Sequence, residues 1–214
     1  MGYYNSLCRS CILCRLPSDF LNLRIITQSF FRVFRRPSAL SSLRDHIVPH
    51  MTPDKFLAEH PYVDYHHPAI DNLCRELFSG LTDDVSKAEA AYHFVRDKIP
   101  HSFDIESDLV PVKASDVLLS GTGICHAKAN LLAALLRHEG IPAGFCFEHI
   151  TLARDEKLGY CVHGFNAVYL GKWVKLDARG NKEGIHAEFS LDEFIPAFPP
   201  REGFDEYFYP GIYA

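Results

Sequence analysis

One stretch near the middle of the 214-residue chain limits the folds that the rest can adopt. It opens with a glycine break, Gly121-Thr122-Gly123, and continues from Cys125 as a run of good helix formers that includes LLAALL. Gly140 and then Pro142 follow this run in the order that is typical of a helix C-terminus. The pattern predicts a helix that begins at Cys125 and stops before Gly140.

Cys125 has two interpretations in this stretch. A thiol in the first turn of a helix lies near unpaired backbone N–H groups and near the positive end of the helix dipole. Both favour the thiolate, which is the form of cysteine that acts as a nucleophile. A free cysteine is also a common core residue. Position alone therefore leaves a reactive thiol and a buried structural thiol as equal alternatives.

Helical patterns come first in the body of the chain, and strand patterns come later. Helices are expected over residues 53–60, 68–78, 86–99 and 115–119. β-branched and aromatic residues predict strands over residues 144–150, 160–170 and 172–178. Separate blocks of helices and strands favour an α+β fold, in which N-terminal helices pack on an antiparallel sheet.

Two capping boxes mark further helix starts. Ser86 with Glu89 predicts the start of the third helix, and Ser190 with Glu193 predicts a short helix that ends at Pro196. The tail over residues 198–214 is rich in proline and aromatic residues, and we expect it to pack as an irregular strap.

Two polar residues, His163 and Asp177, lie in the predicted strands. Each also has a structural interpretation, the first as a core histidine bonded to backbone and the second as a strand-end cap. If residues 170–172 form a three-residue turn, Tyr169 faces Trp173, and the two polar residues share one face with backbones roughly 7–8 Å apart. A two-residue turn would place them on opposite faces. A shared site therefore requires the three-residue turn or a bulge.

Cys125, His163 and Asp177 make a chemically complete set if they meet. The thiolate would attack an acyl carbon, the imidazole would hold or shuttle the proton, and the carboxylate would orient the imidazole and support its charged form. Cysteine and histidine titrate as a coupled pair, so a thiolate–imidazolium form is expected near neutral pH.

Two segments resemble the transglutaminase-like superfamily of papain-type cysteine enzymes, GTGICHAKANLLAALLRHEGIPAGF and VHGFNAVYLGKWVKLDARG. The shared pattern is a Gly-x-Cys at a helix start, an Arg-x-x-Gly-Ile-Pro exit, a strand histidine, a Gly-x-Trp turn and a strand-end aspartate. The resemblance covers about residues 85–180. It implies the papain-like core of that superfamily, with Cys125 as the nucleophile, His163 as the general base and Asp177 as the orienting acid.

The chain departs from the superfamily pattern beside two of these residues. Gly164-Phe165 follows the histidine where the family commonly has Ala-Trp, and Ala178-Arg179 follows the aspartate where many members have Pro-Thr. Neither departure replaces a catalytic side chain, but both reshape the expected substrate cleft.

The residues and the resemblance together predict cysteine-dependent chemistry on a peptide or protein amide substrate, through an acyl-enzyme at Cys125, without cofactor or metal. The acceptor is either water, as in a peptidase, amidase or deamidase, or an amine, as in a transglutaminase. The small size of the chain favours hydrolysis.

The Cys125 backbone N–H is one expected oxyanion donor, and the second is expected from the segment around His101-Ser102 or from the tail. No loop of alternating Asp or Asn with a following Glu is present in the sequence, so we expect calcium independence.

Two other classes of protein remain as alternatives. The first is a catalytically inactive transglutaminase-like binding module, which the presence of all three residue types argues against. The second is a zinc protein that uses Cys161, His163 and another thiol, although the spacing offers too few ligands. The cysteines of the N-terminal segment, Cys8, Cys11 and Cys14, likewise have no second His/Cys pair at a zinc-finger interval.

Charge divides the chain near residue 50. Residues 1–50 hold seven Arg, no Lys and two Asp, a net charge of +5, whereas residues 51–214 hold fifteen basic and twenty-five acidic side chains, a net charge of −10. We therefore expect a basic leader over residues 1–50 and a single domain over residues 51–214. The leader is interpreted either as a loosely folded extension that resembles a transit peptide or membrane-surface segment, or as sequence upstream of a start at Met51.

The same composition limits the partners and the compartment. The leader is too short and too charged to span a bilayer, and it lacks the apolar run of a secretory signal. The acidic domain argues against nucleic-acid binding, which relies on dense Lys and Arg contacts. Scattered cysteines in apolar surroundings are typical of a reducing compartment, so we expect a cytoplasmic protein. The sequence makes no prediction of oligomeric state.

Overall fold

A computed structural model describes residues 52–152 and 155–214 of the chain. The predicted basic leader, residues 1–50, lies outside this part together with Cys8, Cys11 and Cys14. The predictions made for the leader therefore stay predictions.

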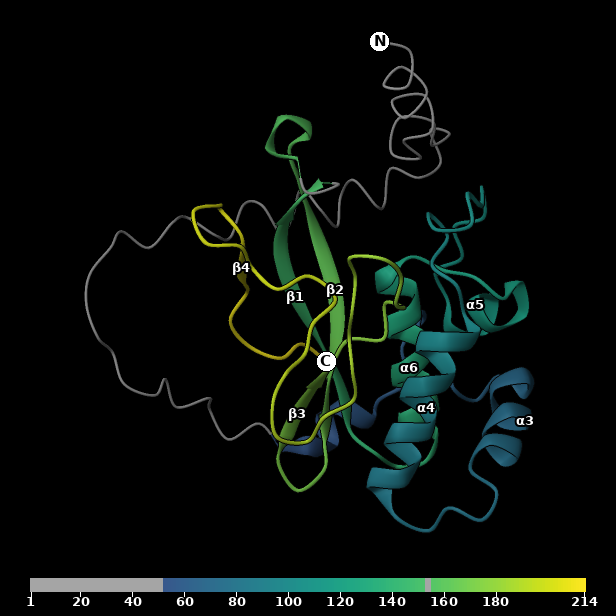
Figure 1. Cartoon of the computed structure of the whole chain (residues 1–214). Helices are drawn as coiled ribbons and strands as arrows, with labels where there is room; N and C mark the ends of the chain where they lie inside the picture. The colour runs from purple at the N-terminus through teal and green to yellow at the C-terminus, as the bar shows by residue number, and fades with distance from the viewer. Residues whose placement is uncertain (1–51, 153–154) are drawn as a thin grey trace. The chain divides into compact units, whose positions relative to one another are not determined.

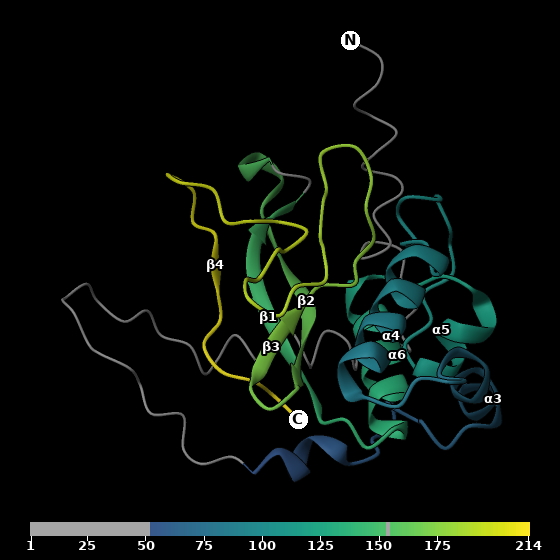
Figure 2. The ribbon, with the colours of Figure 1, turned by 60° about the horizontal axis from the view of Figure 1, so that its bottom comes forward.

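Helix α6 (Cys125–His138) is the element around which the others pack. Its neighbours are two strands and three helices, namely β1 (Ala143–Thr151), β2 (Tyr160–Tyr169), α3 (Pro68–Leu77), α4 (Asp84–Lys98) and α5 (Ala114–Ser120). Figures 1 and 2 show the helices gathered on one side of the sheet. Because neighbours surround α6, nearly every residue from Ala127 to Arg137 is buried. The predicted helix from Cys125 to a point before Gly140 is confirmed.

The sheet has four strands in the order β3-β2-β1-β4, and every pair is antiparallel. Strands β1 and β2 form the long central hairpin, while β3 (Trp173–Leu176) and β4 (Tyr207–Phe208) are short edge strands. Four α-helices in the described residues pack beside this sheet, so the predicted α+β fold is confirmed.

The turn between β2 and β3 contains three residues. Tyr169 pairs with Trp173, and the Leu170 N–H donates to the Lys172 carbonyl at 2.9 Å. Gly171, at the centre of the turn, has a φ of 77°, a conformation that glycine adopts without the cost of a Cβ. This is the turn that places His163 and Asp177 on one face, so the geometric condition set by the sequence is met.

Helix α4 begins earlier than its predicted capping box. Its N-cap is Asp83, whose side chain accepts the Ser86 backbone N–H at 2.9 Å and the Ser86 hydroxyl at 2.7 Å. A carboxylate accepts two donors at once and also favours the positive end of the helix, so Asp83 takes the cap position from the serine. The prediction that Ser86 and Glu89 cap this helix is wrong.

Two other predicted helices are shorter than expected or missing. The first is a 3₁₀ helix of five residues, Pro53–Leu57, and Thr52 makes no capping hydrogen bond with its side chain. Ser190 accepts the backbone N–H groups of Asp192 and Glu193 at 3.3 and 3.2 Å, but no helix follows. Ser190 and Pro196 are separated by little more than one helical turn, and so short a segment forms too few helical hydrogen bonds to offset the free-energy cost of helix nucleation.

The tail packs along the outer edge of β1. Strand β4 pairs with β1, and farther on Phe145 and Tyr213 exchange backbone hydrogen bonds at 2.7 and 2.9 Å. The Glu206 carboxylate also accepts the backbone N–H and hydroxyl of Thr151, at the end of β1, and the Arg201 side chain. The irregular strap expected from the sequence is therefore present, with one short strand in it.

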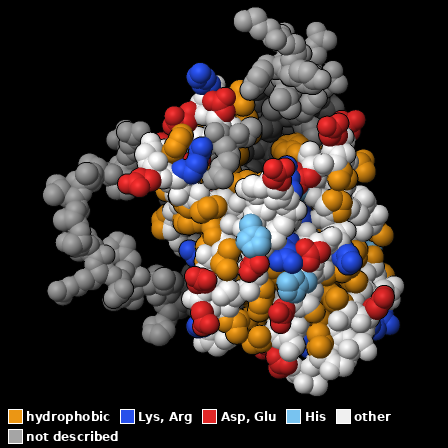
Figure 3. Space-filling view, viewed as in Figure 1, with side chains coloured by type: hydrophobic (Ala, Val, Ile, Leu, Met, Phe, Trp, Pro, Cys, Tyr) orange, Lys and Arg blue, Asp and Glu red, His pale blue; other side chains and the backbone are white. Residues whose placement is uncertain are grey.

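The face of the molecule in Figure 3 carries mixed charge. On the face in Figure 3, acidic and basic side chains are interspersed with apolar ones, and no large basic patch gathers among the described residues of this face. In the same part of the chain, every helix is too short or too polar to cross a bilayer.

The Glu206 contacts predict a pH-dependent contribution to stability. The Arg201 guanidinium holds the pKa of Glu206 well below its usual range, against the effect of burial, and Thr151 adds to the shift. Glu206→Gln should lower the free energy of unfolding by about 2 kcal/mol at pH 7, because charged hydrogen bonds to a buried group are lost. The carboxylate stabilises the fold above its unfolded pKa of 4.5, so this difference should shrink as the pH falls below that value.

Urea unfolding of both proteins at pH 7 and at acidic pH measures this difference. Glu202→Gln, at an exposed position in the same segment, is the matched control. An equal loss at both pH values would contradict the ionic origin of the effect.

Candidate active site

The turn before α6 fixes the position of Cys125. Gly121 ends α5 with a φ of 66°, which favours glycine. Gly123 packs so closely that an added Cβ would lie 3.2 Å from the Cβ of Ala127. Between the glycines, the buried Thr122 hydroxyl donates to the Pro100 carbonyl at 3.0 Å. The Gly-Thr-Gly pattern therefore ties the start of α6 to the segment that begins at Pro100.

Cys125 is the first residue of α6, as predicted, and its thiol is partly buried. Ile124 occupies the N-cap position and makes no capping hydrogen bond with its side chain. The positive end of the helix dipole therefore acts on the sulfur without a competing side-chain cap.

His163 and Asp177 meet in a buried hydrogen bond. The His163 Nε2 lies 2.8 Å from the Asp177 Oδ2, and the two side chains are 2% and 1% exposed. The His163 ring also packs edge-on against Phe198 at 5.1 Å between centroids. Because Nε2 is held by the carboxylate, Nδ1 is the nitrogen left for the Cys125 thiol, with which the ring interacts. The predicted pairing of the histidine with the aspartate is confirmed.

Backbone groups hold the Asp177 carboxylate in place. The Ala197 N–H donates to Oδ2 at 2.8 Å, and the Arg179 N–H donates to Oδ1 at 3.1 Å. Both oxygens thus have fixed partners besides the imidazole, and the carboxylate cannot rotate without losing them. Sequence reasoning missed these two donors because a backbone N–H has no residue signature.

The charges of the site favour an ion pair between thiol and imidazole. Burial opposes the charged form of His163, but the Asp177 carboxylate outweighs it and raises the pKa of His163 well above its ordinary value. Burial likewise opposes ionisation of Cys125. The charge of the His126 ring and hydrogen bonds from three imidazoles outweigh that effect, so the pKa of Cys125 lies well below its ordinary value. The three imidazoles are those of His101, His126 and His163.

The His101 ring accepts the backbone N–H of Cys125 at Nε2, at 3.2 Å, and that of Phe103 at Nδ1, at 3.3 Å. A neutral imidazole has one acceptor nitrogen, so only one of these two bonds exists in a given tautomer. The sequence left the second oxyanion donor open between the His101-Ser102 segment and the tail, and the structure brings the His101 ring to the backbone N–H of Cys125.

His126 is the site residue that sequence reasoning missed entirely. Its Nδ1 lies 3.3 Å from the Cys125 Sγ, and its ring is partly buried. The available signal was its position directly after the cysteine in the first turn of the helix.

The other described cysteines have a different environment. Burial raises the pKa of Cys74 to about 12 and the pKa values of Cys146 and Cys161 to about 11. Within residues 52–152 and 155–214, one group of His, Cys and carboxylate side chains is close enough together to hold a metal ion, namely Cys74, His138 and Glu139. It contains neither Cys161 nor His163, so the described residues give no support to the zinc alternative.

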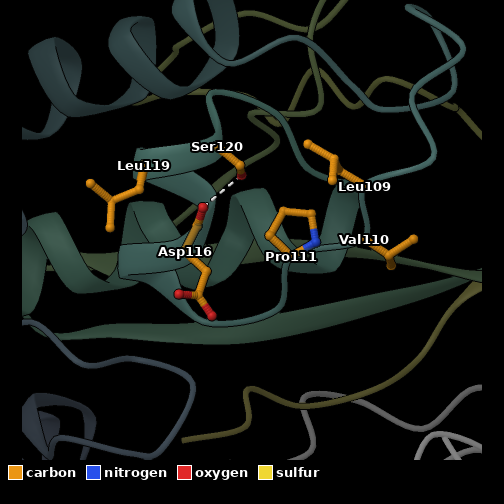
Figure 4. A pocket seen from close by; sticks show the side chains of 6 residues that line it. All are labelled: Leu109, Val110, Pro111, Asp116, Leu119 and Ser120. Atoms are coloured by element: carbon orange, nitrogen blue, oxygen red, sulfur yellow. Dashed lines mark hydrogen bonds between the residues drawn. The ribbon is translucent and has the colours of Figure 1, made fainter.

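A groove of about 470 Å³ lies beside α5, and its lining contains none of the residues described above (Figure 4). Six residues line it: Leu109, Val110, Pro111, Asp116, Leu119 and Ser120. Asp116 is its one ionisable side chain, and the Ser120 hydroxyl donates to the Asp116 carbonyl at 2.6 Å. The groove therefore offers no activated nucleophile, and the candidate site is the cluster at Cys125.

Comparison with known proteins gives a family and two similar solved structures. A candidate cysteine protease from Cytophaga hutchinsonii is 21% identical, with a TM-score of 0.48, over 59% of this chain and 41% of its own. A candidate protease from Parabacteroides distasonis is 17% identical, with a TM-score of 0.40, over 64% of this chain and 26% of its own. The chain thus matches less than half the length of either protein. No curated protein matches it.

The family comparison matches residues 71–178 to the transglutaminase-like superfamily. This range is half of the chain, and it contains Cys125, His163 and Asp177. The chain therefore belongs to the transglutaminase-like superfamily.

Proposed function

We propose that the chain is a cysteine-dependent enzyme that acts on amide or peptide substrates through an acyl-enzyme at Cys125. The observation that carries this proposal is the buried His163–Asp177 pair, joined at 2.8 Å, whose imidazole also interacts with a thiol at a helix N-terminus. A nucleophile, a base and a group that orients the base are the three parts that acyl transfer requires.

In the first step the Cys125 thiolate attacks the carbonyl carbon of the substrate amide. The proton on His163 passes to the leaving nitrogen as the C–N bond breaks, and a thioester remains on the sulfur. In the second step the neutral His163 takes a proton from water while the water oxygen attacks the thioester. The acid leaves, the thiolate returns, and Asp177 supports the charged imidazole in both steps.

The carbonyl oxygen becomes negative in each step and needs hydrogen-bond donors. We propose the Cys125 backbone N–H as the first donor and the Nε2 of His101 as the second. The Phe103 N–H at Nδ1 supports the tautomer with the proton on Nε2. The Cys125 nitrogen and the His101 Nε2 lie 3.2 Å apart in the free protein, where the Cys125 N–H points at Nε2. In this proposal the carbonyl oxygen replaces that contact and accepts from both nitrogens.

Water is the acceptor in this proposal. An amine that reached the thioester before water would form a new amide by the same steps, so the residues at the thiol serve both reactions. Product analysis with and without a primary amine distinguishes them.

The thiol chemistry predicts selective alkylation. Cys125 should react with iodoacetamide well below the ordinary cysteine pKa of about 8.5, because the thiolate persists as the pH falls. Mass spectrometry of each cysteine across a pH series measures this reaction. Cys161 is the matched internal control, since it is also partly buried but has a raised pKa. Equal rates at Cys125 and Cys161 would favour the inactive binding module.

The proposed roles predict the effects of three substitutions on turnover. Cys125→Ala should abolish hydrolysis of fluorogenic peptide amides, and His163→Ala should remove most of it, on the order of 10³-fold or more. Asp177→Asn should also lower kcat strongly, because the amide cannot support the imidazolium. Thermal unfolding of each variant shows whether the fold persists. A folded Cys125→Ala variant with unchanged turnover would refute the proposal.

The oxyanion assignment predicts a separate effect on kcat. His101→Ala should lower kcat by about 10²-fold with little change in KM, because the donor acts mainly on the developing charge. His101→Gln retains an N–H donor and should recover part of the rate. Equal kcat in the wild type and His101→Ala would contradict this role.

A further inference from the structure

His126 contacts the reacting sulfur but has no part in the steps given above. It is the second residue of α6, and its Nδ1 lies 3.3 Å from the Cys125 Sγ. The contact does not depend on substrate, so it exists in the free protein. The thiol therefore has an imidazole neighbour on its own helix in addition to His163 of β2 and His101.

Strand β2 has a glycine where the ring of His126 packs. A Cβ added at Gly164 would lie 2.8 Å from the His126 Cδ2 and 3.2 Å from its Cγ and Nε2. Gly164 does not have a positive φ, so the backbone itself would accept alanine. The glycine is required by the ring. This close approach accounts physically for one departure of the chain from its superfamily, where alanine commonly follows the strand histidine.

The ring is also held from the neighbouring strand. Phe147 of β1 packs against His126 at 6.0 Å between centroids, with the planes tilted by 30°. Contacts with β1 and β2 thus keep Nδ1 directed at the sulfur. The placement is built into the fold and is not a chance rotamer of a surface side chain.

The two imidazoles differ in what else they contact. His163 is 2% exposed and bound to Asp177, whereas His126 is only partly buried. The ionisable groups that act on His126 are the Cys125 thiol on its own helix and His163 on β2, and the thiol is also in contact with His101. Burial opposes the charged form of His126, but the thiolate outweighs it and raises the pKa of His126.

We propose that His126 is the resting ion-pair partner of the nucleophile: in the free protein the S–H bond of Cys125 breaks and the proton moves to the His126 Nδ1. His163, held by Asp177, is then reserved for the protons of the substrate and the acceptor. This inference rests on the proposed function only in taking Cys125 as the nucleophile. The thiolate itself forms without substrate.

The test is the pH dependence of Cys125 alkylation, which requires no turnover. His126→Phe keeps a ring on Gly164 and removes the nitrogen. We expect the rate at pH 6 to fall about tenfold or more, which corresponds to a rise of about one unit or more in the pH midpoint. His93→Phe, at a 43% exposed position on α4, is the matched control and should leave the midpoint unchanged. An unchanged midpoint in a folded His126→Phe protein would overturn the proposal.

A second pair of variants tests the contact without relying on one substitution. Gly164→Ala should raise the alkylation midpoint, because its Cβ displaces the His126 ring. The same change in a His126→Ala background should add nothing, since the ring is no longer there. This non-additivity is the signature of a direct contact. An equal shift of the midpoint in both backgrounds would show that Gly164 acts by another route and would refute the proposal.

The two proposals fail in different ways. If no amide substrate is turned over but the Cys125 midpoint still depends on His126, the proposed function fails and the ion pair stands. If turnover depends on His163 while the midpoint ignores His126 and depends on His163 alone, the function stands and the His126 proposal is overturned.

Discussion

The structure depends on the burial of α6 on all sides. Two long basic side chains of this helix, Lys128 and Arg137, are buried with it. Lys128 donates to the Ile99 carbonyl beyond the end of α4, and Arg137 donates to the Ala143 carbonyl at the start of β1 at 2.7 and 3.0 Å. Burial lowers the pKa of Lys128 to about 7 and that of Arg137 to about 10, so these ties carry an electrostatic cost. The two side chains fix α6 to helix α4 and to strand β1, and this packing sets the position of Cys125.

Charged groups persist in this buried site because each one has fixed hydrogen-bond partners. Asp177 receives the His163 imidazole and two backbone N–H groups, those of Arg179 and Ala197. Ala197 belongs to the segment that leads into the tail, and the tail is anchored on β1 through Glu206. The segment that leads into the C-terminal strap thus helps to orient the imidazole through Asp177. Preorganised donors of this kind stabilise charge without reorganisation during a reaction.

The three imidazoles near the thiol have different contacts, and we propose a different role for each. One histidine is bound to a carboxylate and buried, one lies beside the sulfur on the same helix, and one contacts the backbone N–H of Cys125. In our proposals these are the proton shuttle, the resting ion-pair partner and an oxyanion donor. The glycine after His163 links the first two, because β2 must leave room for the ring of His126.

The sequence determined the parts of this protein that depend on local patterns. The glycine break and the Ala/Leu run were sufficient to place the start of α6 at Cys125. Strand alternation predicted that His163 meets Asp177 only on the condition of a three-residue turn or a bulge, and the structure contains the three-residue turn. The predicted cap of α4 at Ser86 was wrong, because Asp83 is also a residue type that suits a helix start and the local geometry makes it the cap. Tertiary structure alone decided which backbone N–H groups hold Asp177 and which ring packs on Gly164, because such contacts join distant segments through groups that leave no periodic or compositional signal.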